Sequence, residues 1–598
     1  MKKKRYNKLI KNRLIVSSLI LSILVFIFII RLGYLQVVKG ESLSSKAIHQ
    51  WTRDIELKPN RGDIYDRNGK KLSTSVSLYT VSIIPQNISE EKHEDYINKI
   101  SKIIDIEKQK VEIALKSDKN WYEIKRYVET EKAEKLKEEN LIGVSIDETS
   151  KRYYPFDDFL SQVIGNTNRD GVGQYGIEKY FNEILMGNPG RWIKTVDGNR
   201  MELPYNYQKK YEPEDGKNLV LTIDERIQHF AENGAEKALK DNKAKRASVL
   251  VMDPKTGEIL AMASKPGYNP NNRMVLNYDP QSPWIDLGEE YKEKFSEKNW
   301  EEKEDTLYDM WKNTLVSEIY EPGSTFKLLI AAASLEEGLV NTNEKFFCDG
   351  KVTQVPGNIT CLKAHGEQTL EEALENSCNE VPVVLGLRLG KEKIVEYAKA
   401  FGMGDLTGIE LPSEIGGLVK SEKTMKDVDI ATMSFGQGIA VTPIQLINAV
   451  SSIANDGKLM TPRIVKNIVD DEGESVKEFE STYKRQVISK KTAETMMDMM
   501  ESVVSNGSGK NAYIEGYRVG GKTGTSQKAI DGKYVKGKHV ASFVGVAPMD
   551  DPRVSVLTII DEPKGSVHYG GTLAAPITKE IIEESLTYLN VPRRKVED

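Results

Sequence analysis

The stretch Glu321-Pro322-Gly323-Ser324-Thr325-Phe326-Lys327 is followed by an apolar run at residues 328–333. Pro322-Gly323 is expected to end the preceding segment, so Ser324 falls in the first turn of a helix, with Lys327 three residues later on the same face. A serine hydroxyl is a weak nucleophile until a base takes its proton, and a lysine with a depressed pKa can be that base. The helix N-terminus adds backbone N–H groups where an oxyanion would develop. The stretch therefore predicts a site for covalent catalysis.

Two further short motifs lie downstream. The first is Ser377-Cys378-Asn379, and the second is Lys522-Thr523-Gly524-Thr525, which follows Gly520-Gly521 on a strand-like segment. A glycine at position 524 would let a substrate backbone approach the strand closely. The strand can line a groove, so both motifs are candidates for the same site as Ser324.

Each motif taken alone is a weak signal. The Ser-x-x-Lys spacing also occurs at Ser89/Lys92 and at Ser481/Lys484, in hydrophilic contexts with no apolar helix after them. A second Lys-Thr-Gly, at residues 255–257, falls in an Asp-Pro turn between two strand-like runs, where exposed turn residues are expected. The prediction therefore depends on the three motifs occurring together and in this order.

In this order, the three motifs resemble those of the penicillin-recognising serine acyl-transferases, although the middle one is Ser-Cys-Asn where the motif set has Ser-Asp-Asn. Residues 61–69, 152–155 and 176–178 resemble the N-terminal pedestal motifs of class B penicillin-binding proteins, and residues 434–445 resemble their transpeptidase domain. The pedestal motifs are expected to hold an interdomain junction through Gly, Pro and buried Arg and Glu. The resemblance covers nearly the whole chain.

This resemblance implies an α+β fold. A transpeptidase domain, with an antiparallel five-stranded sheet flanked by helices, is expected on an elongated α+β pedestal with one N-terminal transmembrane helix. The sequence pattern agrees, because two strand-like runs at 247–252 and 258–263 precede a long helical middle, and three more follow at 517–526, 539–547 and 553–560. A last helix is predicted at residues 572–589.

The resemblance also implies a chemical role for the motif residues. Ser324 attacks the carbonyl of a terminal D-Ala-D-Ala bond on a peptidoglycan stem peptide. Lys327 is the general base, kept neutral by desolvation and by the nearby Lys522 cation. Ser377 relays the proton to the departing D-alanine, and Asn379 orients Lys327 and the substrate amide.

The substrate's other contacts follow from the third motif. Lys522 and the hydroxyls of Thr523 and Thr525 hold the terminal carboxylate, beside Gly524, and the N–H groups of Ser324 and Thr525 form an oxyanion hole. An amine from a neighbouring strand then resolves the acyl-enzyme into a cross-link. β-Lactams would acylate Ser324, and this acyl-enzyme would deacylate slowly. The same acylation would also serve a β-lactam sensor, a D,D-carboxypeptidase or a β-lactamase, and the chain could also be a scaffold whose catalysis is dispensable.

The N-terminus separates charge from apolarity. Seven basic residues within positions 2–13 precede an uncharged run at residues 14–30, which can extend to Val38 if Arg31 reaches the interface. A cleaved signal peptide is the alternative, but no small-residue cleavage pattern follows the run. We expect a single-pass anchor in the cell membrane with a cytoplasmic N-terminus and an extracytoplasmic catalytic domain.

The predicted domain boundaries follow from these observations. Residues 1–13 form a cytoplasmic basic tail, 14–38 the anchor, 39–215 the pedestal or dimerisation domain, and 216–598 the transpeptidase domain. The polar segment at 208–217 marks the last boundary. Within the pedestal, residues 80–84 resemble a strand and 110–137 a charged helix; residues 285–311 resemble a solvated helical insertion, or a partner-binding surface.

All three cysteines lie in one window with a rare histidine: Cys348, Cys361, His365 and Cys378. Three thiolates and an imidazole would make a closed tetrahedral structural zinc site, which could hold the Ser377/Asn379 loop. A Cys348–Cys361 disulfide and three buried thiols, with His365 bonded to a loop, are the alternatives. The residues alone do not choose between them.

Composition and chain length restrict the partners. The chain of 598 residues has a formal charge of −5, which excludes a nucleic-acid binder that depends on bulk electrostatics. The length leaves no room for a glycosyltransferase domain, so the resemblance implies a membrane glycosyltransferase of the SEDS type as partner, besides stem peptides and β-lactams.

Elongation, division and sporulation roles stay open, although Glu321 and residues 434–445 favour the division and sporulation branch.

Overall fold

The computed structural model describes residues 2–43, 52–195, 209–276, 278–286, 295, 298–357, 359–530 and 532–594. The chain divides into two compact units, residues 1–60 with 187–216 and residues 61–186 with 217–598. The first unit holds helix α1 (Lys2–Gly33), the π-helical turn η1 (Tyr34–Val38) and an antiparallel sheet of β1 (Thr52–Leu57), β6 (Gly190–Thr195) and β7 (Lys209–Tyr211). Within the described residues, Ile10–Val38 is the one helical stretch long and apolar enough to cross a membrane.

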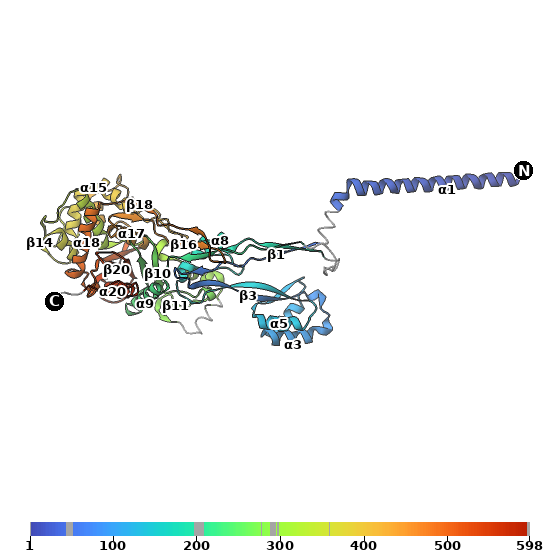
Figure 1. Ribbon diagram of the computed structural model, residues 1–598, viewed down its shortest axis with the longest axis horizontal. Coiled ribbons are helices and arrows are strands. Elements are labelled where there is room, and N and C mark those ends of the chain that lie inside the picture. Colours follow the sequence, from blue (N-terminus) through green and yellow to red (C-terminus); the bar gives the residue numbers. More distant parts are fainter. Residues whose placement is uncertain are drawn as a thin grey trace. The chain divides into compact units, whose positions relative to one another are not determined.

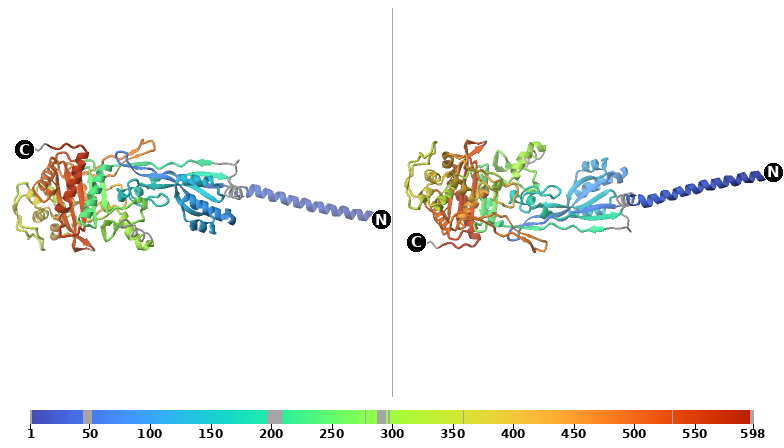
Figure 2. Two further views of the ribbon diagram at one scale, coloured as in Figure 1. Left: turned by 90° about the horizontal axis from the view of Figure 1, so that it is seen from below. Right: turned by 90° about the horizontal axis from the view of Figure 1, so that it is seen from above.

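The centre of the second unit is a five-stranded antiparallel sheet in the order β10-β9-β21-β20-β19. Its strands are β9 (Arg246–Met252), β10 (Ile259–Lys265), β19 (Gly520–Ile530), β20 (Lys533–Ala547) and β21 (Val554–Asp561). Figure 2 shows the red C-terminal strands beside the green ones. The predicted sheet is confirmed, and β19, which carries the Lys522 motif, is an edge strand.

The β19–β20 hairpin is longer than predicted. The expected strands ended at Ser526 and began at His539, whereas the ladder continues to the pair Ile530 and Lys533. The extra residues are mostly polar and show no hydrophobic alternation. Backbone pairing extends this hairpin beyond the stretch that sequence pattern marks as half-buried.

Helices cover both faces of the sheet. Helix α9 (Glu225–Asp241) packs with α20 (Ala575–Tyr588) on one face, and α17 (Pro443–Ile453) lies on the other (Figure 1). Asp224 caps α9, because its carboxylate accepts from the N–H groups of Arg226 and Ile227. The predicted single helix at 572–589 is instead α19 (Gly570–Leu573) followed by α20, since Pro576 sits in the first turn of the second helix.

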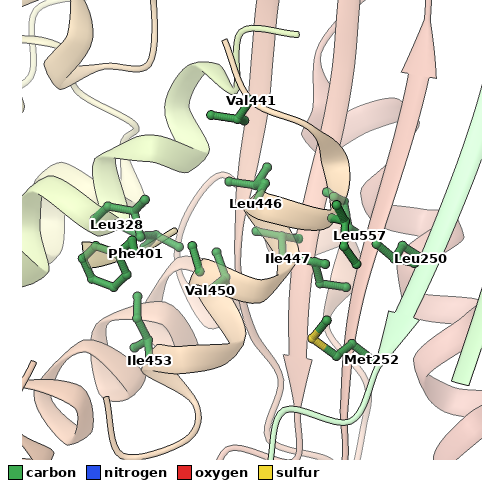
Figure 3. Packing of buried hydrophobic residues seen from close by; sticks show 14 of the residues in the cluster. Leu250, Met252, Leu328, Phe401, Val441, Leu446, Ile447, Val450, Ile453 and Leu557 are labelled. Carbon is green, nitrogen blue, oxygen red and sulfur yellow. The ribbon is translucent and has the colours of Figure 1, made fainter. Parts of the chain in front are cut away.

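The core between α17 and the sheet supports the catalytic helix. Leu446, Ile447 and Val450 of α17 pack among Leu250 and Leu557 of the sheet (Figure 3). The same cluster includes side chains of α13 (Lys327–Glu336), which follows the 3₁₀ turn η5 (Gly323–Phe326). Ser324 therefore lies in a 3₁₀ turn, and the α-helix itself begins at Lys327. Helix α13 is buried almost completely, so Lys327 at its start has little freedom to move.

A second sheet combines four pedestal strands with three strands from beyond the predicted boundary at residue 215. It contains β2 (Ile64–Tyr65), β3 (Lys71–Ile83), β4 (Tyr122–Val128), β5 (Val144–Tyr153), β8 (Asn218–Leu221), β16 (Val465–Val469) and β17 (Ser475–Glu478). Strand β3 includes residues 80–83 of the predicted 80–84 run and ends one residue before the end of that run. The predicted helix at 110–137 is wrong in its middle, because β4 separates α4 (Lys108–Leu115) from α5 (Thr130–Glu138). Pairing with β3 outweighs the high charge of this segment.

The three pedestal motifs meet in one buried ion cluster. Nε of Arg61 lies 2.7 Å from one carboxylate oxygen of Glu178, and Nε of Arg152 lies 2.6 Å from the other. Glu178 is fully buried. Burial would raise the pKa of Glu178, but the charges of Arg152 and Arg61 outweigh this effect and lower it. Arg152 also donates to the carbonyl of Gly62, so the cluster joins all three motifs.

The charged stretch at 285–311 is only partly a solvated helix. Helix α11 (Trp300–Trp311) is exposed on its acidic face, but Leu307, Met310 and Trp311 are buried with Tyr268. Residues 287–294, 296 and 297 of the predicted insertion lie outside the described residues. The remaining middle region contributes α14 (Leu370–Glu375), α15 (Glu380–Ala400) and α18 (Lys490–Ser505), which surround α13.

Candidate active site

The three sequence motifs converge on one pair of amines. Nζ of Lys327 lies 2.7 Å from Oδ1 of Asn379, 2.7 Å from the carbonyl oxygen of Ser377 and 3.4 Å from its hydroxyl. From the third motif, Nζ of Lys522 donates to the same hydroxyl at 3.0 Å and contacts Oγ1 of Thr523 at 3.1 Å. Ser377 is thus the shared partner of two lysines that are far apart in the sequence.

Ser324 is the partly exposed residue of an otherwise buried turn. Gly323 has φ +57°, and a Cβ there would lie 2.7 Å from the carbonyl oxygen of Thr525. Gly436 has φ +80°, and a Cβ there would collide with the carbonyl oxygen of Gly323. These close backbone contacts need glycine, and they fix Ser324 between β19 and the loop that follows α16 (Asp427–Ser434).

Both lysines are buried, and burial changes their basicity. Desolvation lowers the pKa of Lys327 to about 8, even though the nearby thiols of Cys378 and Cys361 act in the opposite direction. Burial, and then the charge of Lys327, lower the pKa of Lys522 well below its usual value. A lysine amine that is partly neutral near neutral pH can accept the proton of a serine hydroxyl.

Comparison with known proteins assigns the family. The family model for the penicillin-binding protein transpeptidase domain matches residues 247–583, and the model for the penicillin-binding protein dimerisation domain matches residues 56–221. The chain is 38% identical over 596 residues to stage V sporulation protein D of Bacillus subtilis, covering 98% of this chain and 88% of that protein. The chain belongs to the class B penicillin-binding proteins.

Other relatives agree. The peptidoglycan D,D-transpeptidase FtsI of Escherichia coli K12 is 29% identical over 571 residues, which covers 94% of this chain and 89% of that protein. A crystal structure of a peptidoglycan synthetase from Bifidobacterium adolescentis aligns with a TM-score of 0.69 and 25% identity, covering 92% of this chain and 98% of that one. These matches span both the pedestal and the transpeptidase domain.

The groove of this penicillin-binding protein also contains residues that no motif marks. Oγ of Ser508 lies 3.5 Å from Oγ1 of Thr523, and the N–H of Gly570 donates to Oγ1 of Thr525 at 3.1 Å. The carboxylate of Glu321 accepts from the N–H of Gly438. The Gly570-Gly571 pair was a sequence signal for one of these residues, since paired glycines can mark a close backbone approach, and a Cβ on Gly570 would collide with β20. Ser508 is placed by the fold alone.

The decoy motifs of this penicillin-binding protein lie outside the site. Ser89, Lys92, Ser481 and Lys484 are all exposed. Lys255 lies in the turn between β9 and β10 and forms an ion pair with Asp551. All three lysines are exposed, so none of these motifs offers the buried amine that the chemistry needs.

The four candidate metal ligands lie together beside the second motif. Their ligand atoms are all within 4.8 Å of one another. Sγ of Cys361 lies 3.6 Å from Sγ of Cys348 and 3.8 Å from Sγ of Cys378, and Nδ1 of His365 lies 3.4 Å from Sγ of Cys348. Tetrahedral zinc with bonds of about 2.3 Å requires sulfur atoms about 3.8 Å apart, so the set fits this ion. The cysteines are unbridged in the structure, with sulfurs too far apart for a disulfide.

This cluster supports the Ser377 loop directly. The N–H of Asn379 donates to Sγ of Cys361 at 3.2 Å, and Cys378 separates the two catalytic candidates. Ser377 has φ +53°, a strained conformation for a residue with a side chain. Such a conformation persists only where its surroundings hold it, so Cys361 and Cys378, which contact or adjoin this loop, have a structural role.

Proposed function

We propose that this protein is a serine D,D-transpeptidase that cross-links peptidoglycan stem peptides through an acyl-enzyme on Ser324. The hydrogen bonds of Lys327 and Lys522 to the Ser377 hydroxyl, together with the bond from Lys327 to Asn379, support this proposal most strongly. Ser324 Oγ attacks the carbonyl of the D-Ala-D-Ala bond while Lys327 takes its proton. The C–N bond then breaks, and the departing D-alanine receives a proton through Ser377.

The second half of the reaction forms the cross-link. An amine of a neighbouring stem peptide attacks the acyl-enzyme ester, a new amide bond forms, and the ester bond to Ser324 breaks as the hydroxyl regains its proton. The N–H groups of Ser324 and Thr525 stabilise the oxyanion in both halves, and one such donor contributes about 3–4 kcal/mol. Lys522, Thr523 and Thr525 bind the substrate carboxylate, with Ser508 beside them.

Penicillin is expected to acylate the same hydroxyl. We assign none of the described residues as a base for rapid hydrolysis of the penicillin adduct. The adduct should therefore be long-lived, which is expected of a transpeptidase and not of a β-lactamase. Ile10–Val38 is the one candidate span among the described residues, which favours an enzyme over a β-lactam sensor with a polytopic membrane part. Labelling with fluorescent penicillin tests the acylation, with Ser324→Ala as the control. In the presence of an acceptor amine, a transpeptidase should form a dimeric peptide product. A carboxypeptidase should release only the free acid.

We also propose that Cys348, Cys361, His365 and Cys378 hold one structural Zn²⁺. Four ligands would close the coordination shell, so the ion would stabilise the Ser377 loop and take no part in acyl transfer. The ligand spacing and the strained backbone of Ser377 support this proposal. Metal analysis of purified wild type and Cys378→Ser tests it. About one zinc per chain is expected for wild type and much less for the variant; equal content, or none in either, would reject the site.

For localisation, we propose a single-pass membrane protein with a cytoplasmic N-terminus. The helix at Ile10–Val38 and the basic residues before it support this topology. The glycan polymerase would then be a separate membrane glycosyltransferase of the SEDS type. Protease digestion of intact spheroplasts should degrade the catalytic domain, and crosslinking in membranes should capture the polymerase; a protected catalytic domain would contradict the topology.

For the cellular role, we propose the division and sporulation branch of the family. The identity to a sporulation protein, 38%, is higher than the 29% to a division transpeptidase. Depleting the protein should impair septation or spore wall formation without turning rods into spheres. Round cells would indicate an elongation role instead.

A further inference from the structure

A cavity of about 420 Å³ lies beside the catalytic turn. Its lining includes Tyr320 and Glu321, which precede Ser324, and Gly438 of the loop that contacts Gly323. Residues 526–529 of β19, which follow the Lys522 motif directly, form another wall. The cavity therefore extends the catalytic groove along the same edge strand.

The order of groups along β19 gives the direction of the donor peptide. Lys522 and Thr523, proposed to bind its carboxylate, come before Thr525, whose N–H is proposed to face the scissile carbonyl. β19 has an unpaired outer edge, on which an extended peptide can lie antiparallel. Because each residue advances about 3.3 Å, the residue N-terminal to D-Ala-D-Ala lies beside 526–529. Its side chain is the part of the substrate closest to the cavity.

The charges around this cavity do not balance. Its lining has three carboxylates, Glu318, Glu321 and Asp561, against two cations, Arg246 and Lys528. Arg246 pairs with Glu318 at 3.2 Å, and Lys528 pairs with Asp561 at 2.6 Å. Among the residues that the structure describes, no basic side chain lies within 4.0 Å of the Glu321 carboxylate. Glu321 is the surplus negative charge.

Glu321 is nonetheless held in a defined position. One carboxylate oxygen accepts from the N–H of Gly438 at 2.8 Å and from the hydroxyl of Tyr534 at 2.9 Å. Tyr534 lies on β20 and is half exposed, so it belongs to the rim. Both donors are neutral. The second oxygen lies 3.1 Å from the same Tyr534 hydroxyl and still has a lone pair for another donor. Burial raises the pKa of Glu321, as expected for a carboxylate without a cationic partner.

We propose that Glu321 is a specificity-determining residue that binds an ammonium group on the side chain of the donor residue immediately N-terminal to D-Ala-D-Ala. The inference rests on the proposed transpeptidase function. The bound ammonium supplies the missing positive charge, and Gly438 and Tyr534 keep the carboxylate aimed at it. A cationic side chain here also positions the scissile carbonyl, because it fixes the peptide at a point close to Ser324.

Three thioester donors test this proposal on the full-length protein. They are Nα-acetyl-L-lysyl-D-alanyl thioglycolate and its forms with the ε-amine acetylated or succinylated. Ser324 forms an ester with the alanyl carbonyl, the C–S bond breaks, and thioglycolate is released and measured. For wild type we expect kcat/KM about tenfold higher for the free amine than for the acetylated form, because hydrogen bonds to charged groups are stronger than neutral ones. The succinylated form should be slower still.

The matched variants locate the preference. Glu321→Gln should bring the ratio of free to acetylated donor close to one, and Glu321→Asp should retain part of it. Glu337→Gln, a carboxylate change at the distant end of α13, should keep the wild-type ratio. Equal rates for the three donors with wild type, or an unchanged ratio in Glu321→Gln, would overturn the proposal. Absence of acylation by every thioester and by labelled penicillin would instead contradict the transpeptidase function.

Discussion

Lys327 and Asn379 are joined by a 2.7 Å hydrogen bond from Nζ to Oδ1, although 52 positions separate them. The amide side chain of Asn379 is itself fixed, because its Nδ2 donates to the carbonyl of Thr360 at 2.8 Å. Lys327 is therefore oriented by a neutral acceptor in a buried site. A neutral partner leaves the amine free to lose its proton, whereas a carboxylate would hold the proton on it.

Replacing this neutral acceptor by an anion should disable the base. Asn379→Asp would place a carboxylate about 2.7 Å from Nζ of Lys327 and raise the pKa of the amine. Acylation by penicillin at pH 7 should fall by at least about tenfold, since one pKa unit changes the neutral fraction tenfold. The rate should recover at higher pH. Asn376→Asp is the control, because Asn376 lies in the same loop but is bonded to Gln368. This variant should keep the wild-type pH dependence of the acylation rate.

Acylation of wild type should itself depend on pH through Lys327. The neutral amine is the reactive base, and burial lowers the pKa of Lys327 to about 8. The second-order rate constant for penicillin should therefore rise with pH and level off above about 8, with about one tenth of the maximum at pH 7. Stopped-flow measurement between pH 6 and 10 checks this. A rate that falls across this interval would show that a protonated group limits acylation.

The glycine that supports the nucleophile should not tolerate a side chain. In Gly436→Ala the new Cβ would collide with the carbonyl oxygen of Gly323 and displace the Ser324 turn. A displacement of about 1 Å can cost about a hundredfold in rate. Gly473→Ala is a matched control, because Gly473 also has positive φ but nothing lies within 4 Å of its Cβ position. Comparable acylation rates for the two variants would argue against a rigid turn.

Breaking the buried ion cluster of the pedestal should destabilise the protein. Glu178→Gln would leave Arg61 and Arg152 buried without a counter-charge, at a cost of about 3–5 kcal/mol in the free energy of unfolding. Urea unfolding followed by fluorescence measures the loss. Glu183→Gln, an exposed neighbour, should have almost no effect. Equal unfolding midpoints for the two variants would mean that the cluster adds little stability.

Removing the proposed zinc should weaken acylation without removing the catalytic groups. Chelation should lower the thermal unfolding midpoint and slow penicillin acylation, because the strained Ser377 would lose its support. Adding Zn²⁺ back should restore both in wild type but not in Cys378→Ser. Chelation that changes neither property would reject a structural metal.

Much of the site could be predicted because its chemistry is local in sequence. Ser324 and Lys327 share one turn, and Ser377 and Asn379 share one loop, so short spacing carries their geometry. The five-stranded sheet was predictable from apolar runs. By contrast, β4 lies in a charged segment, and its pairing with β3 is decided by tertiary contacts.

Other groups of the site reach it only through the fold. Ser508 approaches β19 from a segment with no distinguishing pattern, and Gly570 is marked only by the glycine pair to which it belongs. The role of Glu321 depends on which cations are already paired with other carboxylates, and this is a property of the folded structure alone.

Mass spectrometry of the protein after exposure to penicillin tests the acyl-enzyme most directly. Wild type should gain the mass of one intact penicillin per chain, and peptide mapping should place it on Ser324. Ser324→Ala, with an unchanged thermal midpoint, should gain none. An adduct on another residue of wild type, or an equal adduct in folded Ser324→Ala, would contradict the assignment of Ser324 as the nucleophile.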